Sequence, residues 1–197
     1  MENSPLTPHA VVSFARSHLQ AFQEIPKIKA GVTHKAVPQH RCAPPPGNIK
    51  INFDAAVFKN TLDIGVGVIC RDSSGSCIAW FSHRLTRFAT TELAEAFAAR
   101  EALLLASRHG LQSFQLEGDC EVLIRKFQSP NPDSSTLGVV IEEIKQLASL
   151  LLCSFSIVRR KGNNVAHILA QNSSSRLEGI SNYPPCIASL LATDFHI

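Results

Sequence analysis

The sequence lacks the features of membrane-spanning and secreted proteins. Its 197 residues contain no run of about 18 apolar residues, so we expect no transmembrane helix. The first ten residues, MENSPLTPHA, do not join a basic region to an apolar block, so we expect no secretory signal peptide. The expectation is therefore an intracellular protein, nuclear or cytoplasmic, that does not bind membranes.

Paired cysteines are also missing. The six cysteines are scattered along the chain: Cys42, Cys70, Cys77, Cys120, Cys153 and Cys186. None of them belongs to a C-x-x-C pair, which argues against a structural zinc site and against a disulfide framework. This pattern is typical of a protein in a reducing compartment.

Excess charge is confined to the first 48 residues. The net charge is +3, and residues 1–48 hold five basic and two acidic residues, whereas residues 49–197 hold 14 of each. By bulk charge, the second part is not a basic nucleic-acid-binding domain. Any contact with nucleic acid must therefore use a local basic patch or metal ions.

Proline divides the chain into a leader and one domain, as the length and the ordinary globular composition suggest. Residues 1–47 are interpreted as an N-terminal helix followed by a proline-rich linker. This leader is either poorly ordered or contains a helix that docks on the domain or on a neighbour. The domain is predicted at residues 48–175. Residues 176–197 form a C-terminal tail, whose apolar run 187–192 we expect to pack on the domain.

Hydrophobic periodicity predicts three antiparallel strands at the start of the domain. Residues 50–58 alternate between apolar and other residues, and two apolar runs, 62–71 and 76–85, are joined by turn residues. Connections this short produce a meander of neighbouring strands. Gly65 and Gly67 mark places where another backbone approaches the second strand closely.

Helices and strands alternate in the rest of the domain. The predicted elements are a long helix at 92–109, a strand at 113–118, helices at 120–127 and 137–150, a strand at 153–159 and a helix at 163–173. The expected caps are Thr90 or Thr91, Thr136 and Asn163, with Gly110 as a C-terminal stop. The order β-β-β-α-β-α-α-β-α predicts an α/β fold with a mixed five-stranded sheet flanked by helices.

Three acidic residues stand in apolar surroundings at the edges of predicted elements. Asp54 lies in the first strand, Glu95 near the start of the long helix, and Asp119 directly after the fourth strand. Converging acids repel one another unless divalent ions lie between them, and oxygen ligands suit Mg²⁺ or Mn²⁺. Taken singly, the three could also be an edge-strand charge, a helix-dipole acid and an N-cap.

Four sequence blocks, in this order, resemble one known family. The blocks are K-I-N-F-D-A-A at 50–56, A-E-A-F-A-A-R-E-A-L at 94–103, L-E-G-D at 116–119 and R-x-x-N-x-x-A-H-x-L-A at 160–170. They resemble the type 1 ribonuclease H family, and more narrowly its plant reverse transcriptase-like branch, found in non-LTR retroelements and in host genes derived from them. The proline-rich residues 43–47 are similar to the lead-in of that branch.

The resemblance implies a fold and a reaction. The implied fold is the RNase H-like sheet in strand order 3-2-1-4-5, with strand 2 antiparallel. The implied reaction is metal-dependent hydrolysis of the RNA strand of an RNA/DNA hybrid, with Asp54, Glu95 and Asp119 binding two Mg²⁺ ions that Mn²⁺ could replace. Two such ions about 4 Å apart supply a nucleophilic hydroxide and stabilise the leaving oxygen. The expected partner is an RNA/DNA hybrid, and the expected state is a monomer.

His167 departs from the catalytic pattern of that family, because it stands where a fourth carboxylate is usual. Imidazole is a poorer partner for Mg²⁺ than a carboxylate, so we expect weakened activity. The histidine could instead orient water, contact phosphate or cap a polar pocket. The alternative is a catalytically silent RNase H-like module that binds nucleic acid or protein.

Nucleic-acid contacts are expected beside the acids. Arg159, Arg160 and Lys161 form the densest basic cluster, and they either grip a phosphate backbone or form a solvated loop. Asn52 lies on the same strand face as Asp54 and is expected to contact a sugar hydroxyl.

Overall fold

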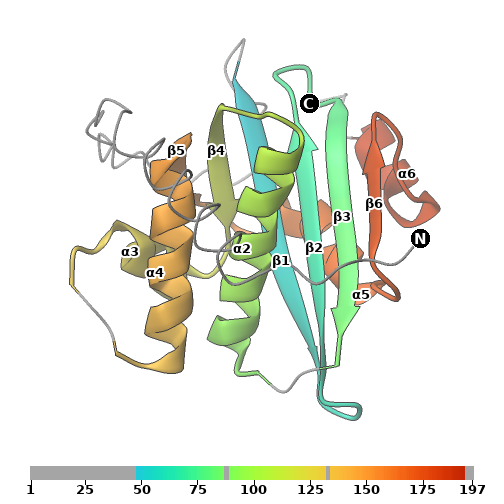
Figure 1. Cartoon of the computed structure of the whole chain (residues 1–197). Helices are drawn as coiled ribbons and strands as arrows, with labels where there is room; N and C mark the ends of the chain where they lie inside the picture. Colours follow the sequence, from blue (N-terminus) through green and yellow to red (C-terminus); the bar gives the residue numbers. More distant parts are fainter. Residues whose placement is uncertain (1–47, 87–88, 132–133, 194–197) are drawn as a thin grey trace, which may run out of the picture. The chain divides into compact units, whose positions relative to one another are not determined.

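The structure is a computed structural model that describes residues 48–86, 89–131 and 134–193. The predicted helix and linker of residues 1–47 lie outside these ranges. Figure 1 shows the arrangement of the strands and helices along the chain. Within the described ranges, every helix is too short or too polar to cross a membrane.

The sheet has six strands in the order β5-β4-β1-β2-β3-β6 (Figure 1). Their bounds are β1 (Ile49–Phe58), β2 (Asp63–Arg71), β3 (Cys77–Leu85), β4 (Ser113–Gly118), β5 (Leu152–Ile157) and β6 (Leu177–Ile180). Strand β2 runs antiparallel to β1 and β3, whereas β1, β4 and β5 are parallel. The first five strands therefore confirm the expected order 3-2-1-4-5 with strand 2 antiparallel.

The sixth strand corrects the predicted number of five. Strand β6 comes from the segment interpreted as a tail and pairs antiparallel with the outer edge of β3. It has only four residues and no alternation, so periodicity could not reveal it. Gly179 lets it lie against Trp80, because a Cβ there would collide with the indole ring. The predicted packing of the apolar run is confirmed, since Ile187 and Leu191 are buried.

Helices cover both faces of the sheet (Figure 1). Their bounds are α2 (Thr91–Arg108), α3 (Glu121–Gln128), α4 (Thr136–Ser149), α5 (Asn164–Gln171) and α6 (Pro185–Thr193), and the 3₁₀-helix η1 (Arg160–Asn163) leads into α5. Helices α2 and α4 pack together over the larger apolar core, which includes Ile51 and Phe53 of β1. Helix α5 packs on β1 and β2 with α6 beside it, around a smaller core that contains Trp80.

The ends of α2 are capped as the sequence predicts. The hydroxyl of Thr90 accepts a hydrogen bond from the backbone N–H of Leu93 at 3.3 Å. At the other end, Gly110 has a φ of +65°, and the N–H of Leu111 donates to the carbonyl oxygen of Ala106 at 2.9 Å. This is a Schellman motif, which satisfies the last carbonyls of the helix.

The N-terminal caps of α4 and α5 correct the prediction. Ser135, rather than Thr136, caps α4 by accepting a hydrogen bond from the N–H of Gly138 at 3.1 Å. Asn163 occupies the N-cap position of α5, but its side chain makes no capping bond. Its amide is engaged by β1 instead.

The close approach of α5 to β2 confirms the expectation for Gly65 and Gly67. A Cβ on Gly65 would collide with the carbonyl oxygen of Ala170, and a Cβ on Gly67 would collide with the carbonyl oxygen of Ala166. Both obstacles are helix backbone, which cannot rotate away as a side chain would. The two glycines therefore set the distance between α5 and the sheet.

Candidate active site

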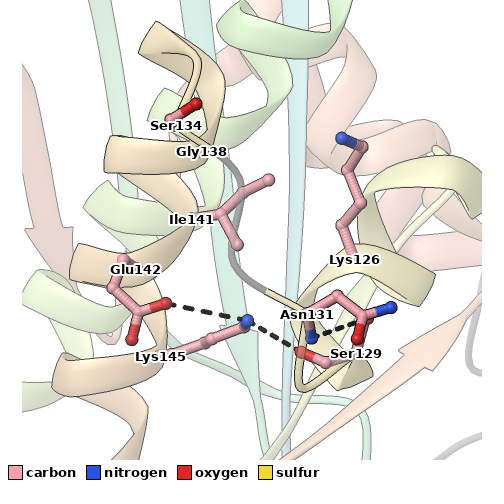
Figure 2. Close-up of a pocket in the computed structure, with 8 residues that line it drawn as sticks. All are labelled: Lys126, Ser129, Asn131, Ser134, Gly138, Ile141, Glu142 and Lys145. Carbon is pink, nitrogen blue, oxygen red and sulfur yellow. Dashed lines mark hydrogen bonds and ion pairs between the residues drawn. The ribbon is translucent and has the colours of Figure 1, made fainter.

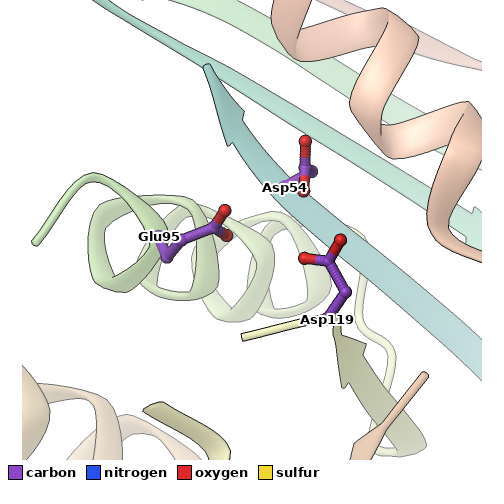
Figure 3. A group of neighbouring side chains, drawn as sticks. All are labelled: Asp54, Glu95 and Asp119. Atoms are coloured by element: carbon purple, nitrogen blue, oxygen red, sulfur yellow. The ribbon is translucent and has the colours of Figure 1, made fainter. Parts of the chain in front are cut away.

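Three acidic side chains converge where β1 and β4 cease to pair. The parallel ladder ends at Asn52 and Glu117, and Asp54 and Asp119 each lie two residues further along the chain. Glu95 reaches the same place from α2 (Figure 3). One carboxylate oxygen from each acid lies within 4.8 Å of the other two. The sequence expectation that these three acids meet is therefore confirmed.

Burial makes negative charge at this place costly. The exposed fraction is 0% for Asp54 and 3% for Glu95. Burial, and then the charge of Asp119, raises the pKa of Asp54 to about 6, although a hydrogen bond from His167 and the charge of Arg160 oppose the shift. Burial, and then the two aspartates, raises the pKa of Glu95 well above its ordinary value. The cluster therefore favours a bound proton or cation over free carboxylates.

The donor set fits a divalent cation. Within the described part of the chain, the buried Oε2 of Glu95 has no hydrogen-bond partner. A buried polar atom left in this way costs about 1–3 kcal/mol, which a bound cation would offset. Carboxylate oxygens are the ligands that Mg²⁺ and Mn²⁺ prefer. Of the described residues, only Asp54, Glu95 and Asp119 bring three potential metal ligands this close together.

The guanidinium of Arg160 bridges two of the acids. Its Nη1 donates to Oδ1 of Asp54 at 3.1 Å and to Oδ2 of Asp119 at 2.7 Å. The side chain of Arg160 is 55% exposed, so it reaches the buried carboxylate from the surface. The sequence predicts a nucleic-acid contact for Arg160, whereas in this structure it is directed at the acids. Its neighbours Arg159 and Lys161 are exposed.

His167 approaches Asp54 from α5. Its Nδ1 lies 2.8 Å from Oδ2 of Asp54. When Asp54 is ionised, its carboxylate only accepts hydrogen bonds, so Nδ1 then carries the hydrogen in this pair. The Nη2 of Arg160 lies 3.0 Å from Nδ1 and 3.4 Å from Nε2, which places the guanidinium against the imidazole ring. The histidine is therefore a donor to the central acid, and its predicted catalytic role stays a prediction.

Asn163 is a site residue that sequence reasoning misassigned as a helix cap. Its Nδ2 donates to the backbone oxygen of Phe53 at 2.8 Å and lies 3.4 Å from Oδ1 of Asp54. The side chain is buried and ties η1 to β1. Its place in the fourth sequence block, between Arg160 and His167, is the signal that could have revealed it.

The position of Asn52 does not agree with a surface contact. Its exposed fraction is 1%. Its Nδ2 donates to Glu117 at 3.1 Å, and its Oδ1 accepts from Arg71. Glu117 also pairs with Lys50 at 3.0 Å. Because both ends of the amide are used inside the protein, Asn52 cannot reach a sugar hydroxyl in this arrangement, and its role is to join β1 to β4.

A pocket of about 390 Å³ opens beside the acids. It is lined by Asp119, Glu121, Ile157, Val158, Arg159 and Arg160. The lining combines two acidic and two basic residues, so Arg159 lies in the same pocket as the potential metal ligand Asp119. Two residues of the predicted basic cluster, Arg159 and Arg160, line this pocket, and the predicted contact with nucleic acid stays a prediction.

A second pocket, of about 410 Å³, lies between α3 and α4 (Figure 2). It is lined by Lys126, Ser129, Asn131, Ser134, Gly138, Ile141, Glu142 and Lys145. The ammonium of Lys145 already donates to the backbone oxygen of Ser129 at 2.8 Å. None of the three converging acids lines this pocket, whereas Asp119 lines the pocket of about 390 Å³. We therefore place the candidate active site at the pocket that Asp119 lines.

Solved structures of ribonucleases H share this fold. The ribonuclease H1 of the archaeon Halobacterium salinarum is 26% identical over 64% of this chain and 96% of its own, with a TM-score of 0.54. The ribonuclease H domain from Mycobacterium tuberculosis is 19% identical over 64% and 91%, with a TM-score of 0.58. A compost-derived ribonuclease H1 in complex with an RNA/DNA hybrid is 21% identical over 64% and 96%, with a TM-score of 0.58. The architecture is therefore the ribonuclease H fold.

The family comparison covers the candidate site. Residues 52–173 match the reverse transcriptase-like family, and this range contains Asp54, Glu95, Asp119 and His167. No curated protein sequence shows a significant match. Because the matched range is more than half of the chain, the chain belongs to the reverse transcriptase-like family.

Proposed function

We propose that this chain is a divalent-metal-dependent endonuclease that hydrolyses the RNA strand of RNA/DNA hybrids. The observation that carries the proposal is the cluster of Asp54, Glu95 and Asp119, in which a buried oxygen of Glu95 lacks a hydrogen-bond partner among the described residues. The substrate class is supported by the likeness to ribonucleases H, one of which was solved with an RNA/DNA hybrid.

In the proposed reaction, Asp54, Glu95 and Asp119 would hold two Mg²⁺ ions, which Mn²⁺ could replace. Such ions would supply activation of a water molecule and stabilisation of the leaving oxygen. The water oxygen forms a bond to phosphorus while the bond between phosphorus and the 3′ oxygen of the RNA breaks, and a proton passes to that oxygen. The protein's contribution is to hold three carboxylates close together in a buried place, where they would repel one another without a cation between them.

Other residues support this arrangement. Asn163 and His167 donate hydrogen bonds toward the two oxygens of Asp54 and so fix the plane of its carboxyl group. Arg159 and Lys161 are exposed next to the site, where they can contact backbone phosphates. Because His167 stands where a fourth carboxylate would add negative charge, we expect slow cleavage with Mg²⁺.

The second candidate is a catalytically silent module that binds nucleic acid or protein, derived from a plant retroelement as the four sequence blocks suggest. One observation favours it. Asp54 is already hydrogen-bonded by Arg160 and His167 within the protein, so part of its charge is balanced without any ion. A module of this kind would bind a hybrid and leave it intact.

Cleavage of an end-labelled RNA/DNA hybrid, with Mg²⁺ and separately with Mn²⁺, separates the two candidates. The enzyme should cut only the RNA strand, and Asp54→Asn should abolish cutting with either ion. Glu142→Gln is the matched control, because Glu142 is an exposed acid that lies outside the cluster and should be dispensable. A hybrid that is bound but uncut by the wild type would support the silent module.

A further inference from the structure

The guanidinium of Arg160 uses the same oxygens that a metal ion would need. Its Nη1 donates to one oxygen of Asp54 and one of Asp119, so a single nitrogen links two of the three acids. Asp119 otherwise raises the pKa of Asp54 by repulsion, and Arg160 opposes that shift. Arg160 therefore stabilises the cluster in the way a bound cation would.

Arg160 can leave this position without unfolding the protein. Its side chain is 55% exposed, while that of Asp54 is fully buried. It is the first residue of η1, and η1 is anchored to β1 by the buried Asn163 rather than by Arg160. Rotation about the side-chain bonds of Arg160 would therefore break its hydrogen bonds to both carboxylates without moving η1.

A divalent ion and the guanidinium of Arg160 compete for the carboxylate oxygens of Asp54 and Asp119, so binding of one weakens binding of the other. Arg160 supplies one positive charge among three acids, and the burial of Asp54 and Glu95 makes their ionised carboxylates costly. An ion bound to Asp54 and Asp119 would lie next to the guanidinium nitrogen and repel it, since both are cations that seek the same lone pairs. Gain of the ion therefore requires loss of the Arg160 contacts.

We infer that Arg160 is a resident competitor for the metal site: it holds Asp54 and Asp119 together when no ion is bound, and it must turn away when an ion binds. This inference rests on the proposed function for the metal site itself. It assigns to Arg160 a positioning role that makes the metal-free protein more stable and the metal affinity lower. A purely structural residue would not show these opposite effects.

The test measures ion binding rather than cleavage. Mn²⁺ is titrated into the 197-residue chain without nucleic acid, and binding is followed by calorimetry and by the electron paramagnetic resonance of free Mn²⁺. Arg160→Gln should bind Mn²⁺ about five- to tenfold more tightly than the wild type, because a partly exposed ion pair that opposes binding is removed. In EDTA the same variant should melt at a lower temperature than the wild type, because the acids are left without their cation.

Lys161→Gln is the matched control, since it removes the same charge from the adjacent, exposed position. It should change Mn²⁺ affinity by less than about twofold, the effect expected of a screened surface charge. Equal or weaker Mn²⁺ binding by Arg160→Gln than by the wild type would overturn the competitor role while leaving the metal site intact. If neither protein binds Mn²⁺, the proposed metal site is wrong and the competitor role falls with it.

Discussion

At the scale of single residues, Asp54 is the point where the interactions of the site meet. One of its oxygens accepts a hydrogen bond from Arg160 and lies near Asn163, and the other lies against His167. No part of the side chain reaches solvent. Because this buried acid can bind a proton, the stability of the protein should depend on pH. Because Arg160 and His167 contact the same carboxylate, a change in either residue should alter the affinity of the site for a metal ion.

The raised pKa of Asp54 gives a pH dependence of stability with a definite sign. Its pKa is about 6 in the folded, metal-free protein against an ordinary value of 3.8, so the folded state binds the proton more tightly. The free energy of unfolding should therefore fall as the pH rises from about 4 to about 6, by at most about 3 kcal/mol. Urea unfolding in EDTA at several pH values measures it. Asp54→Asn should lack this contribution, and equal pH dependence in both proteins would contradict the assignment.

His167→Asp tests whether the histidine limits the proposed reaction. A fourth carboxylate beside Asp54 adds negative charge that favours a second ion, and loss of a supporting contact to a metal site typically changes activity about 10- to 100-fold. The variant should cleave a hybrid faster than the wild type with Mg²⁺. With the wild type, Mn²⁺ should restore part of the rate, because it accepts nitrogen ligands more readily. A slower His167→Asp would show that the imidazole has a positive role of its own.

At the scale of elements, the sequence predicts the helices and strands whose hydrophobic periodicity and capping residues lie within or directly beside the element. Strand β1 shows its alternation, and α2 carries both caps in its own flanking residues, Thr90 and Gly110. Strand β6 has no such signal, because its four residues become a strand only when the edge of β3 is present to pair with them. Hydrophobic periodicity therefore predicts five of the six strands and misses β6.

The same distinction applies to the site. The three acids are predictable because each is a carboxylate in or directly after an apolar stretch of a strand or helix, and parallel pairing of β1 and β4 then brings two of them together. Neither the inward direction of Arg160 nor the hydrogen bond from Asn163 to β1 follows from hydrophobic periodicity or capping patterns, although the fourth sequence block marks both residues. Both depend on where η1 lies relative to strands that are far away in the sequence.

Gly67→Ala tests the contact between α5 and the sheet. The added Cβ would collide with backbone atoms of Ala166 and Ala170, so α5 must shift, and we expect a loss of about 1–3 kcal/mol in the free energy of unfolding. Chemical unfolding measures this loss. Gly75→Asn is the control: Gly75 has a φ of +83° but nothing within 4 Å of an added Cβ, and asparagine tolerates that conformation. If both variants are equally stable, the close approach does not constrain the fold.

At the scale of the whole molecule, net charge and local charge differ. Residues 49–197 carry equal numbers of acidic and basic residues, yet Arg159 and Lys161 are exposed together at the edge of the acidic site. Attraction of a polyanion is therefore expected at one place rather than over the surface as a whole. Affinity for nucleic acid should be low and sensitive to salt.

The double substitution Arg159→Gln and Lys161→Gln measures this local attraction. Each phosphate contact adds close to one unit to the slope of log affinity against log salt, so the slope should fall by nearly two. Fluorescence anisotropy of a labelled hybrid in EDTA gives the slope without cleavage. Lys59→Gln combined with Arg176→Gln removes the same charge from the turn after β1 and the segment before β6, and should leave the slope nearly unchanged. A slope that is unchanged by the first double substitution and lowered by the second would show that the phosphate contacts lie away from η1.

The acids come from different parts of the fold: Asp54 from β1, Asp119 from the residue directly after β4, and Glu95 from α2 on one face of the sheet. Arg160 and His167 come from η1 and α5. No single layer carries a complete set of ligands. An ion bound as proposed would therefore add its binding energy only to the fully assembled molecule. Amide protons that exchange through global opening should slow when Mn²⁺ is added, while those that exchange by local fraying at β6 should keep their rates. Metal affinity in this protein would then be a measure of folding cooperativity.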